Sequence, residues 1–285
     1  ILDLSKVEAG HIEPELLDRE QQIALRSREQ PEQRGTTDLG HWDLFIRGRH
    51  HYWRAGPAQY ALATSLFEQA LALAPDDAPT LSMLALTELG EVWGGTARDP
   101  AGMIRKAHDY AMRAIASDPR DAGAHYALGI VLSITGQFEQ AMAEQRRALE
   151  LNPTNAQAMA ELGRLHAFRG DVDAALACVE EALRYSPNDP HDWLWLRSRA
   201  IAHFVGGRHD EALVHARSAC TRRPDFFFLH FLVAACLAVT GDIENARIAC
   251  AEGLKLNPRY GLGALRAGHP FARPGDLEKF IEALQ

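Results

Sequence analysis

The chain repeats itself with a period of 34 residues, and this feature constrains its fold more than any single motif does. When residues 122–155 are aligned with residues 156–189, the same residue types fall in register from end to end. A period between about 20 and 50 residues is typical of architectures in which one supersecondary unit is stacked many times. The aligned pairs, each 34 positions apart, are Leu128 and Leu162, Gly129 and Gly163, Gly136 and Gly170, Ala141 and Ala175, Ala148 and Ala182, and Pro153 and Pro187.

Each repeated position has a mechanical reason in a hairpin of two helices. Gly129 lies midway along the first helix, where the lack of a side chain lets the second helix approach closely. Ala141 and Ala148 allow the same approach from the second helix. Gly136 ends the first helix, and Pro153 ends the second because proline cannot donate a hydrogen bond within a helix. The repeat therefore predicts pairs of helices joined by short turns.

This pattern resembles the tetratricopeptide repeat, and the resemblance implies an all-α, right-handed α-solenoid of about six helix hairpins. The register has two defects, three extra residues between Pro187 and Pro224 and ten between Pro75 and Pro119, which we place at residues 93–100. In the first hairpin we expect helices over residues 42–52 and 60–73. The six predicted repeats are residues 41–77, 78–121, 122–155, 156–189, 190–226 and 227–260.

Two flanking segments complete the chain. Within residues 1–40, apolar spacing predicts a helix over residues 14–28, and residues 30–40 favour a polar linker that would tether an upstream domain. Because the first residue is not Met, we interpret the sequence as a segment of a longer protein. Residues 261–285 end in a predicted helix that would cap the last repeat. Its apolar stripe consists of Leu277, Phe280, Ile281 and Leu284.

Composition excludes several classes of partner. With 30 basic and 38 acidic residues the formal charge is −8, so no overall positive field attracts nucleic acid or anionic lipid. No apolar run approaches the roughly 18 residues of a membrane span. The cysteines form no CxxC pair and lie in Ala-rich helical runs, which predicts free thiols in a reducing compartment and a cytoplasmic protein. These cysteines are Cys178, Cys220, Cys236 and Cys250.

A second resemblance covers nearly the whole chain. Residues 12–17, IEPELL, followed by a polar linker and residues 42–48, WDLFIRG, are similar to the segment that opens the C-terminal repeat region of bacterial class III adenylate cyclase-like and winged-helix regulator proteins. Residues 66–73 and, near the end of the chain, residues 269–271 and 276–280 continue this similarity. In such proteins the catalytic or DNA-binding domain precedes the repeats, so the resemblance implies regulation and supplies no catalytic residue here.

Sequence motifs for catalysis or for metal binding are missing. The chain has no GxxxxGK[ST], HExxH or GxSxG motif. Residues 261–266, GLGALR, place Arg where a dinucleotide loop needs Gly or Ala, and a helix start is the better interpretation. His203, His209 and His215 fall on a first helix, a turn and a second helix, so no i, i+4 pair shares one face. We expect no enzymatic activity, no cofactor and no metal site in this segment.

The informative surface of such an array is its concave face, which the first helices of the hairpins line. Lys and Asn, which clamp a C-terminal carboxylate in some repeat arrays, do not occupy the concave positions here, and this disfavours a chaperone-tail partner. Our hypothesis is a groove for an apolar, partly acidic peptide or helix, with Arg and aromatic side chains as anchors. The alternative is that the aromatic residues belong to the core. The proposed groove residues are Tyr126, Arg164, Arg197, Phe204, Phe228 and Phe231.

Three functional hypotheses remain open at this stage. The first is a regulatory region of a bacterial signalling protein that binds a protein or peptide, or associates with itself. The second is a control segment of a nucleotide cyclase whose catalytic domain lies upstream. The third is a free-standing assembly factor. All three describe a protein-interaction scaffold.

Overall fold

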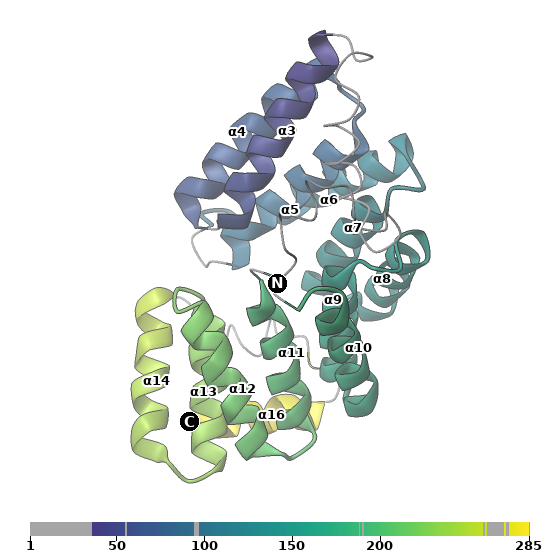
Figure 1. The fold of residues 1–285 in the computed structure, drawn as a ribbon. Coiled ribbons are helices and arrows are strands. Elements are labelled where there is room, and N and C mark those ends of the chain that lie inside the picture. Colours follow the sequence, from purple (N-terminus) through teal and green to yellow (C-terminus); the bar gives the residue numbers. More distant parts are fainter. Residues whose placement is uncertain are drawn as a thin grey trace, which may run out of the picture.

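The structure, a computed structural model, describes residues 36–54, 56–93, 97–187, 189, 191–258, 260, 271 and 274–284. Within these ranges the secondary structure is entirely helical (Figure 1). The predicted helix at 14–28 and the segment 261–266 lie outside the described residues. The helices are α3 (Thr36–Arg54), α4 (Pro57–Leu73), α5 (Ala78–Trp93), α6 (Pro100–Ser117), α7 (Ala122–Ile134), α8 (Phe138–Leu151), α9 (Ala156–Arg169), α10 (Val172–Tyr185), α11 (Asp192–Val205), α12 (His209–Arg222), α13 (Phe227–Val239), α14 (Ile243–Leu256) and α16 (Pro274–Leu284).

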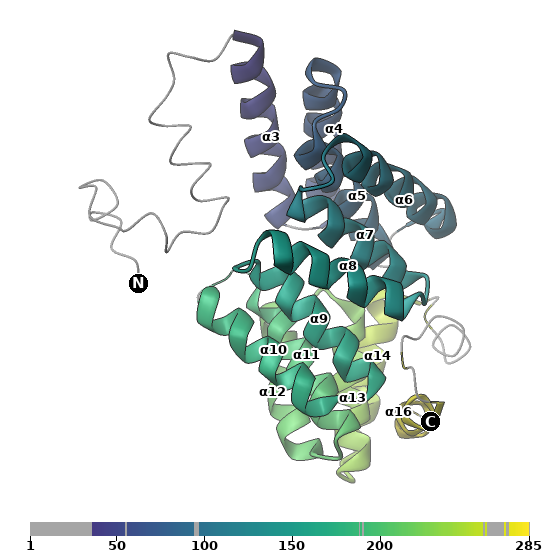
Figure 2. The ribbon, with the colours of Figure 1, turned by 90° about the vertical axis from the view of Figure 1, so that its right-hand side faces the viewer.

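Consecutive helices from α3 to α14 pack as six hairpins, and each hairpin packs on the next (Figures 1 and 2). The first helices of neighbouring hairpins also touch one another, from α5 through α7, α9 and α11 to α13. This arrangement confirms the predicted all-α solenoid. The predicted linker over residues 30–40 is wrong in its last part, because α3 already begins at Thr36.

The repeated small residues lie where the hairpins close. Ala141, Ala148, Ala175 and Ala182 have no exposed surface. Gly170 ends α9 with a positive φ of 83°, a conformation that glycine adopts without strain. The insertion expected at residues 93–100 lengthens the second hairpin, since α5 and α6 have 16 and 18 residues where most other array helices have 13 or 14.

A side chain at Gly163 has no room. A Cβ atom there would lie 3.0 Å from the backbone oxygen of Ala175 and 3.1 Å from a methyl group of Val179. We expect Gly163→Ala to lower the free energy of unfolding by about 1–2 kcal/mol, because the forced separation of α9 and α10 outweighs the gain in helix propensity. Urea unfolding measures this loss. Gly275→Ala, at a helical position with open space around it, is the matched control and is expected to be neutral or slightly stabilising.

The C-terminal helix is present where the sequence predicts one. We expected α16 to cap the last repeat, and its main contacts are with α13, the first helix of that repeat. Its Phe280 reaches Phe204 of α11 and Phe228 of α13, with ring centroids 5.5 and 6.1 Å apart. The helix therefore packs against first helices of two hairpins, and Ile248 on the last second helix, α14, stays exposed.

Candidate functional site

The first helices surround a cavity of about 490 Å³ on the concave side of the array. Its lining is mainly aromatic and apolar, with a few charged side chains. The residues that line it include Tyr52, Trp53, Tyr60, Trp93, Tyr126, Ile130, Ser133, Gln157, Ala160, Glu161, Arg164, Phe168, His191, Trp193, Leu194, Arg197, Arg223, Asp225, Phe226, Phe227, Phe228 and Tyr260.

The array curves far enough for its first hairpin to meet its fifth. His191 at the start of α11 donates a hydrogen bond from Nε2 to the backbone oxygen of Trp53, 3.1 Å away, and the two rings lie 4.4 Å apart. Close by, Tyr60 of α4 is hydrogen-bonded to Arg223 at the end of α12. These contacts turn the open concave groove of a solenoid into a partly enclosed cavity.

A carboxylate supports this junction. Asp189 Oδ1 accepts a hydrogen bond from the backbone N–H of His191 at 2.8 Å and lies 3.5 Å from its Nδ1, and Ser186 donates to Oδ2 at 3.0 Å. Burial alone would raise the pKa of Asp189, but the hydrogen bonds from His191 and Ser186 outweigh it and lower this pKa. The carboxylate is therefore stabilised in its charged form.

The junction makes a pH-dependent contribution to stability. Because the pKa of Asp189 is lowered on folding, its contribution is fully present above the unfolded pKa of about 4 and is lost as the pH falls through the folded value. We expect Asp189→Asn to cost about 1.5 kcal/mol at pH 7 and less below about pH 4. Unfolding at the two pH values measures this difference. Asp109→Asn, on the exposed side of α6, should change stability little, and an equal loss in both variants would contradict a role of Asp189 in the junction.

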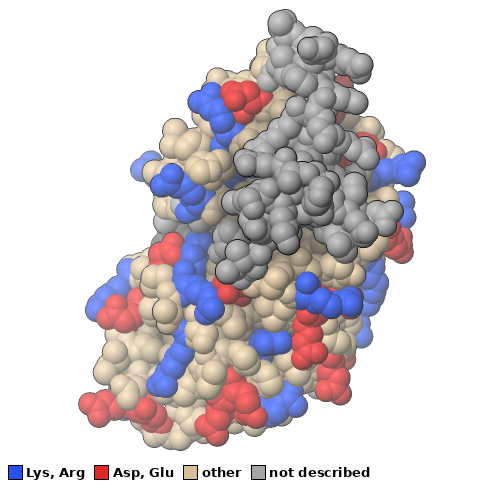
Figure 3. All heavy atoms as spheres, in the orientation of Figure 1, with Lys and Arg blue, Asp and Glu red and all other residues tan. Residues whose placement is uncertain are grey.

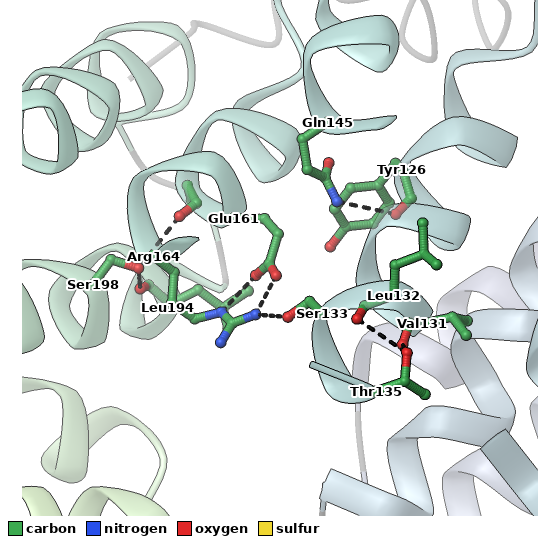
Figure 4. A network of polar contacts seen from close by, with 11 residues as sticks. Tyr126, Val131, Leu132, Ser133, Thr135, Gln145, Glu161, Arg164, Leu194 and Ser198 are labelled. Carbon is green, nitrogen blue, oxygen red and sulfur yellow. Dashed lines mark hydrogen bonds and ion pairs between the residues drawn. The ribbon is translucent and has the colours of Figure 1, made fainter. Parts of the chain in front are cut away.

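A polar cluster forms one wall of the cavity (Figure 4). Arg164 of α9 donates from Nε to Glu161 at 2.8 Å, and its Nη2 donates both to Glu161 and to Ser133 of α7. Both members of the ion pair are largely buried. Behind them Gln145 donates from Nε2 to the backbone oxygen of Tyr126 at 3.2 Å. The charge of Arg164 is thus paired with a carboxylate of the protein.

Arg197 of α11 differs from Arg164. It forms no ion pair with any described residue, and its Nε is buried without a hydrogen-bond partner. Its guanidinium carbon lies 5.5 Å from the ring centre of Trp193, over which Arg223 also lies at 4.9 Å. Burial, together with the neighbouring Arg164 cation, lowers the pKa of Arg197 to about 9, so it remains charged at neutral pH. The cavity therefore holds a cation that the protein does not neutralise.

The structure divides the six proposed groove residues into two groups. Tyr126, Arg164, Arg197 and Phe228 line the cavity. The expectation that Phe204 and Phe231 also face a groove is wrong, since each is only 3% exposed and neither lines the cavity.

Their burial has a clear cause. Phe204 packs against Phe280 of α16, and Phe231 packs against Tyr260 with ring centres 5.4 Å apart. For these two residues the alternative of a core position, which the sequence left open, is the observed one.

Sequence reasoning missed the walls that come from distant hairpins. Trp53, Tyr60 and Arg223 join the cavity through the closure of the array, and no repeat position marks them. Trp93 is the exception, because it lies at the edge of the insertion that interrupts the repeat register. Its contact with the cluster that contains Trp193 and Phe226 places the inserted hairpin beside the fifth and sixth repeats.

Outside the cavity, His203 and His215 lie next to one another, although they belong to different helices. The rings of His203 and His215 stack with centres 5.3 Å apart, and Arg208 donates to Nδ1 of His203 at 2.9 Å. Burial and nearby arginines lower the pKa of both histidines. No group of three potential metal ligands occurs among the residues that the structure describes.

Charge is mixed on the outer surface. On the face seen in Figure 3, Lys and Arg are interspersed with Asp and Glu wherever the described residues are visible. Within the described ranges, no helix has the length and apolar character needed to cross a membrane.

Comparison with known proteins identifies the repeat. Residues 110–143 and 160–225 match models of the tetratricopeptide repeat. A thermophilic TPR protein of Thermus thermophilus is 25% identical, with a TM-score of 0.52 over 69% of this chain and 98% of that one. PilF of Pseudomonas aeruginosa is 18% identical, also with a TM-score of 0.52, over 79% of this chain and 96% of its own. No curated protein sequence matches the chain.

Proposed function

We propose that this chain is a protein-interaction scaffold that binds a segment of a partner protein in the concave cavity, because residues 110–143 and 160–225 match tetratricopeptide-repeat models and such repeats bind proteins on their concave face. The observation that carries this proposal is the cavity itself, an aromatic pocket on the concave face that contains the charged Arg197. Mainly apolar pockets with a few well-placed polar groups are typical of binding sites.

The size of the cavity restricts the bound segment. About 490 Å³ lies within the range of small-ligand sites, whereas a helix with its side chains is about 10 Å across. The cavity therefore accommodates a few side chains but not a partner helix of several turns. Aromatic walls such as Trp193 and Phe228 favour large apolar side chains as anchors.

The role is one of binding. The polar groups beside Arg197 are held in fixed pairs, since Ser133 and Glu161 both accept hydrogen bonds from Arg164. The remaining surface of the cavity is mostly apolar and carries the cation of Arg197. Such a surface suits the binding of a partner, whereas proton transfer would need an acid or base that is not held in an ion pair.

For the biological context we propose the regulatory C-terminal region of a bacterial signalling protein. The similarity over residues 42–48 and 66–73, which form parts of α3 and α4, supports this assignment. A nucleotide cyclase under control of the array, or a free-standing assembly factor, are the alternatives. The sequence upstream of residue 1 distinguishes them: a cyclase domain supports the cyclase, a winged helix supports the regulator, and an independent short protein supports the assembly factor.

The cavity can be tested without knowledge of the partner. Peptides selected from a random displayed library on the wild-type protein should lose binding to Leu194→Trp, which places a large ring in the cavity. Val214→Trp is the matched control, because Val214 is 61% exposed on α12. Failure to select any binder, or selected peptides that bind Leu194→Trp as well as wild type, would contradict the proposed function.

A further inference from the structure

The charged residues that line the cavity do not balance. Three are arginines, Arg164, Arg197 and Arg223, and two are carboxylates, Glu161 and Asp225, so these five side chains carry three minus two, or one, net positive charge. An unpaired charge in a largely apolar pocket raises the free energy of the folded protein unless an opposite charge binds beside it.

Two of the three arginines have carboxylate partners. Arg164 is paired with Glu161, as described above. Arg223 donates from Nε to Asp225 at 2.8 Å and is also hydrogen-bonded to Tyr60. The charge of each of these two guanidinium groups is therefore already neutralised by a carboxylate of the protein.

The excess charge is that of Arg197. Glu161 attracts Arg197, but this carboxylate is hydrogen-bonded to Arg164. The cation of Arg164 in turn repels that of Arg197. Its flat guanidinium lies against the indole of Trp193 and borders the cavity. A planar guanidinium of this kind has two parallel donors for the two oxygens of a carboxylate.

We propose that the partner segment inserts one acidic side chain, flanked by aromatic or large apolar residues, and that its carboxylate binds Arg197 alone. This inference rests on the proposed function and adds the chemistry of the bound segment. The sequence hypothesis gave Arg164 and Arg197 the same role. In this inference Arg164 does not bind the partner and instead holds Glu161 and Ser133 in place.

An acidic side chain fits better than the carboxylate at a chain end. Arg197 lies over the ring of Trp193, and the polar groups that act on it are Arg164, Glu161 and Tyr126. Of these, Glu161 already accepts hydrogen bonds from Arg164, as does the nearby Ser133. A chain end would bring backbone amides next to the carboxylate and bury them among these groups. The methylenes of Glu instead place apolar atoms there and keep the backbone farther away.

Three capped tripeptides test the inference. The probes are acetyl-Phe-Glu-Phe-amide, its neutral analogue acetyl-Phe-Gln-Phe-amide, and acetyl-Phe-Gln-Phe with a free C-terminal carboxylate. Fluorescence of the tryptophans that line the cavity reports binding, since the probes contain no tryptophan. We expect the Glu peptide to bind at least about tenfold more tightly than either of the others, the effect of one charged hydrogen-bonded contact.

Variants of Arg197 decide whether the preference arises there. In Arg197→Met the advantage of the Glu peptide should disappear, and Arg197→Lys should restore part of it. Circular dichroism and the unfolding midpoint verify that both variants fold. Equal binding of the Glu and Gln peptides, tighter binding of the free-carboxylate peptide, a preference that survives Arg197→Met, or no binding of any probe would overturn this inference. The library selection with Leu194→Trp judges the proposed function separately.

Discussion

Phe280→Ala is expected to lower the free energy of unfolding by about 3–5 kcal/mol, the usual cost of removing a fully buried aromatic ring. Phe280 of α16 has no exposed surface, and its ring contacts those of Phe204, Phe228 and Phe271. Its loss leaves a cavity among aromatic side chains that come from separate parts of the chain. Urea unfolding followed by circular dichroism measures the change.

The control for this variant lies on the same helix. Glu282 is exposed on α16, and Glu282→Ala should change stability by no more than about 0.5 kcal/mol. Hydrogen exchange adds a second measurement, because α16 should exchange faster in Phe280→Ala before the array unfolds. If the two variants have the same stability, α16 does not hold the concave side of the array together.

The position of α16 explains why part of the predicted groove is core. The apolar stripe of residues 277–284 predicted an amphipathic helix, and the helix is present. A stripe specifies that a face is buried but not which surface buries it. The same ambiguity applies to Phe228 and Phe231, three positions apart on α13, of which only Phe228 borders the cavity.

The hairpins were predictable because their determinants are local. Gly163 of α9 lies close to the backbone of Ala175 in α10, and only the short turn between these helices separates the two residues in sequence. A repeat alignment therefore identifies both. The closure of the array has a different origin. Each hairpin is rotated slightly relative to the one before it, and the closure is the sum of these rotations, so no single residue determines it. The contact between Trp53 and His191 joins residues 138 positions apart and could not be found from the period of 34 residues.

These two contributions meet in the cavity. Local repeat positions supply Tyr126, Arg164 and Arg197, and closure supplies Tyr60 and Arg223. The charge balance becomes visible only when both sets are counted, because Asp225 neutralises Arg223 and Glu161 neutralises Arg164. From their sequence positions alone, Arg164 and Arg197 had the same predicted role in binding a partner.

The two arginines should therefore respond oppositely to the same substitution. Arg164→Met removes the partner of a buried carboxylate and is expected to cost about 3 kcal/mol, at the low end for a broken buried ion pair because Arg197 remains near Glu161. Arg197→Met removes a buried cation that has no carboxylate of its own, and replacing such a charge with an apolar side chain of similar length is expected to be neutral or to stabilise by about 1 kcal/mol. Unfolding of the unliganded protein in urea measures both. A similar loss in the two variants would mean that Glu161 is shared equally between the arginines, and Arg197 would then no longer be the uncompensated charge that a partner carboxylate neutralises.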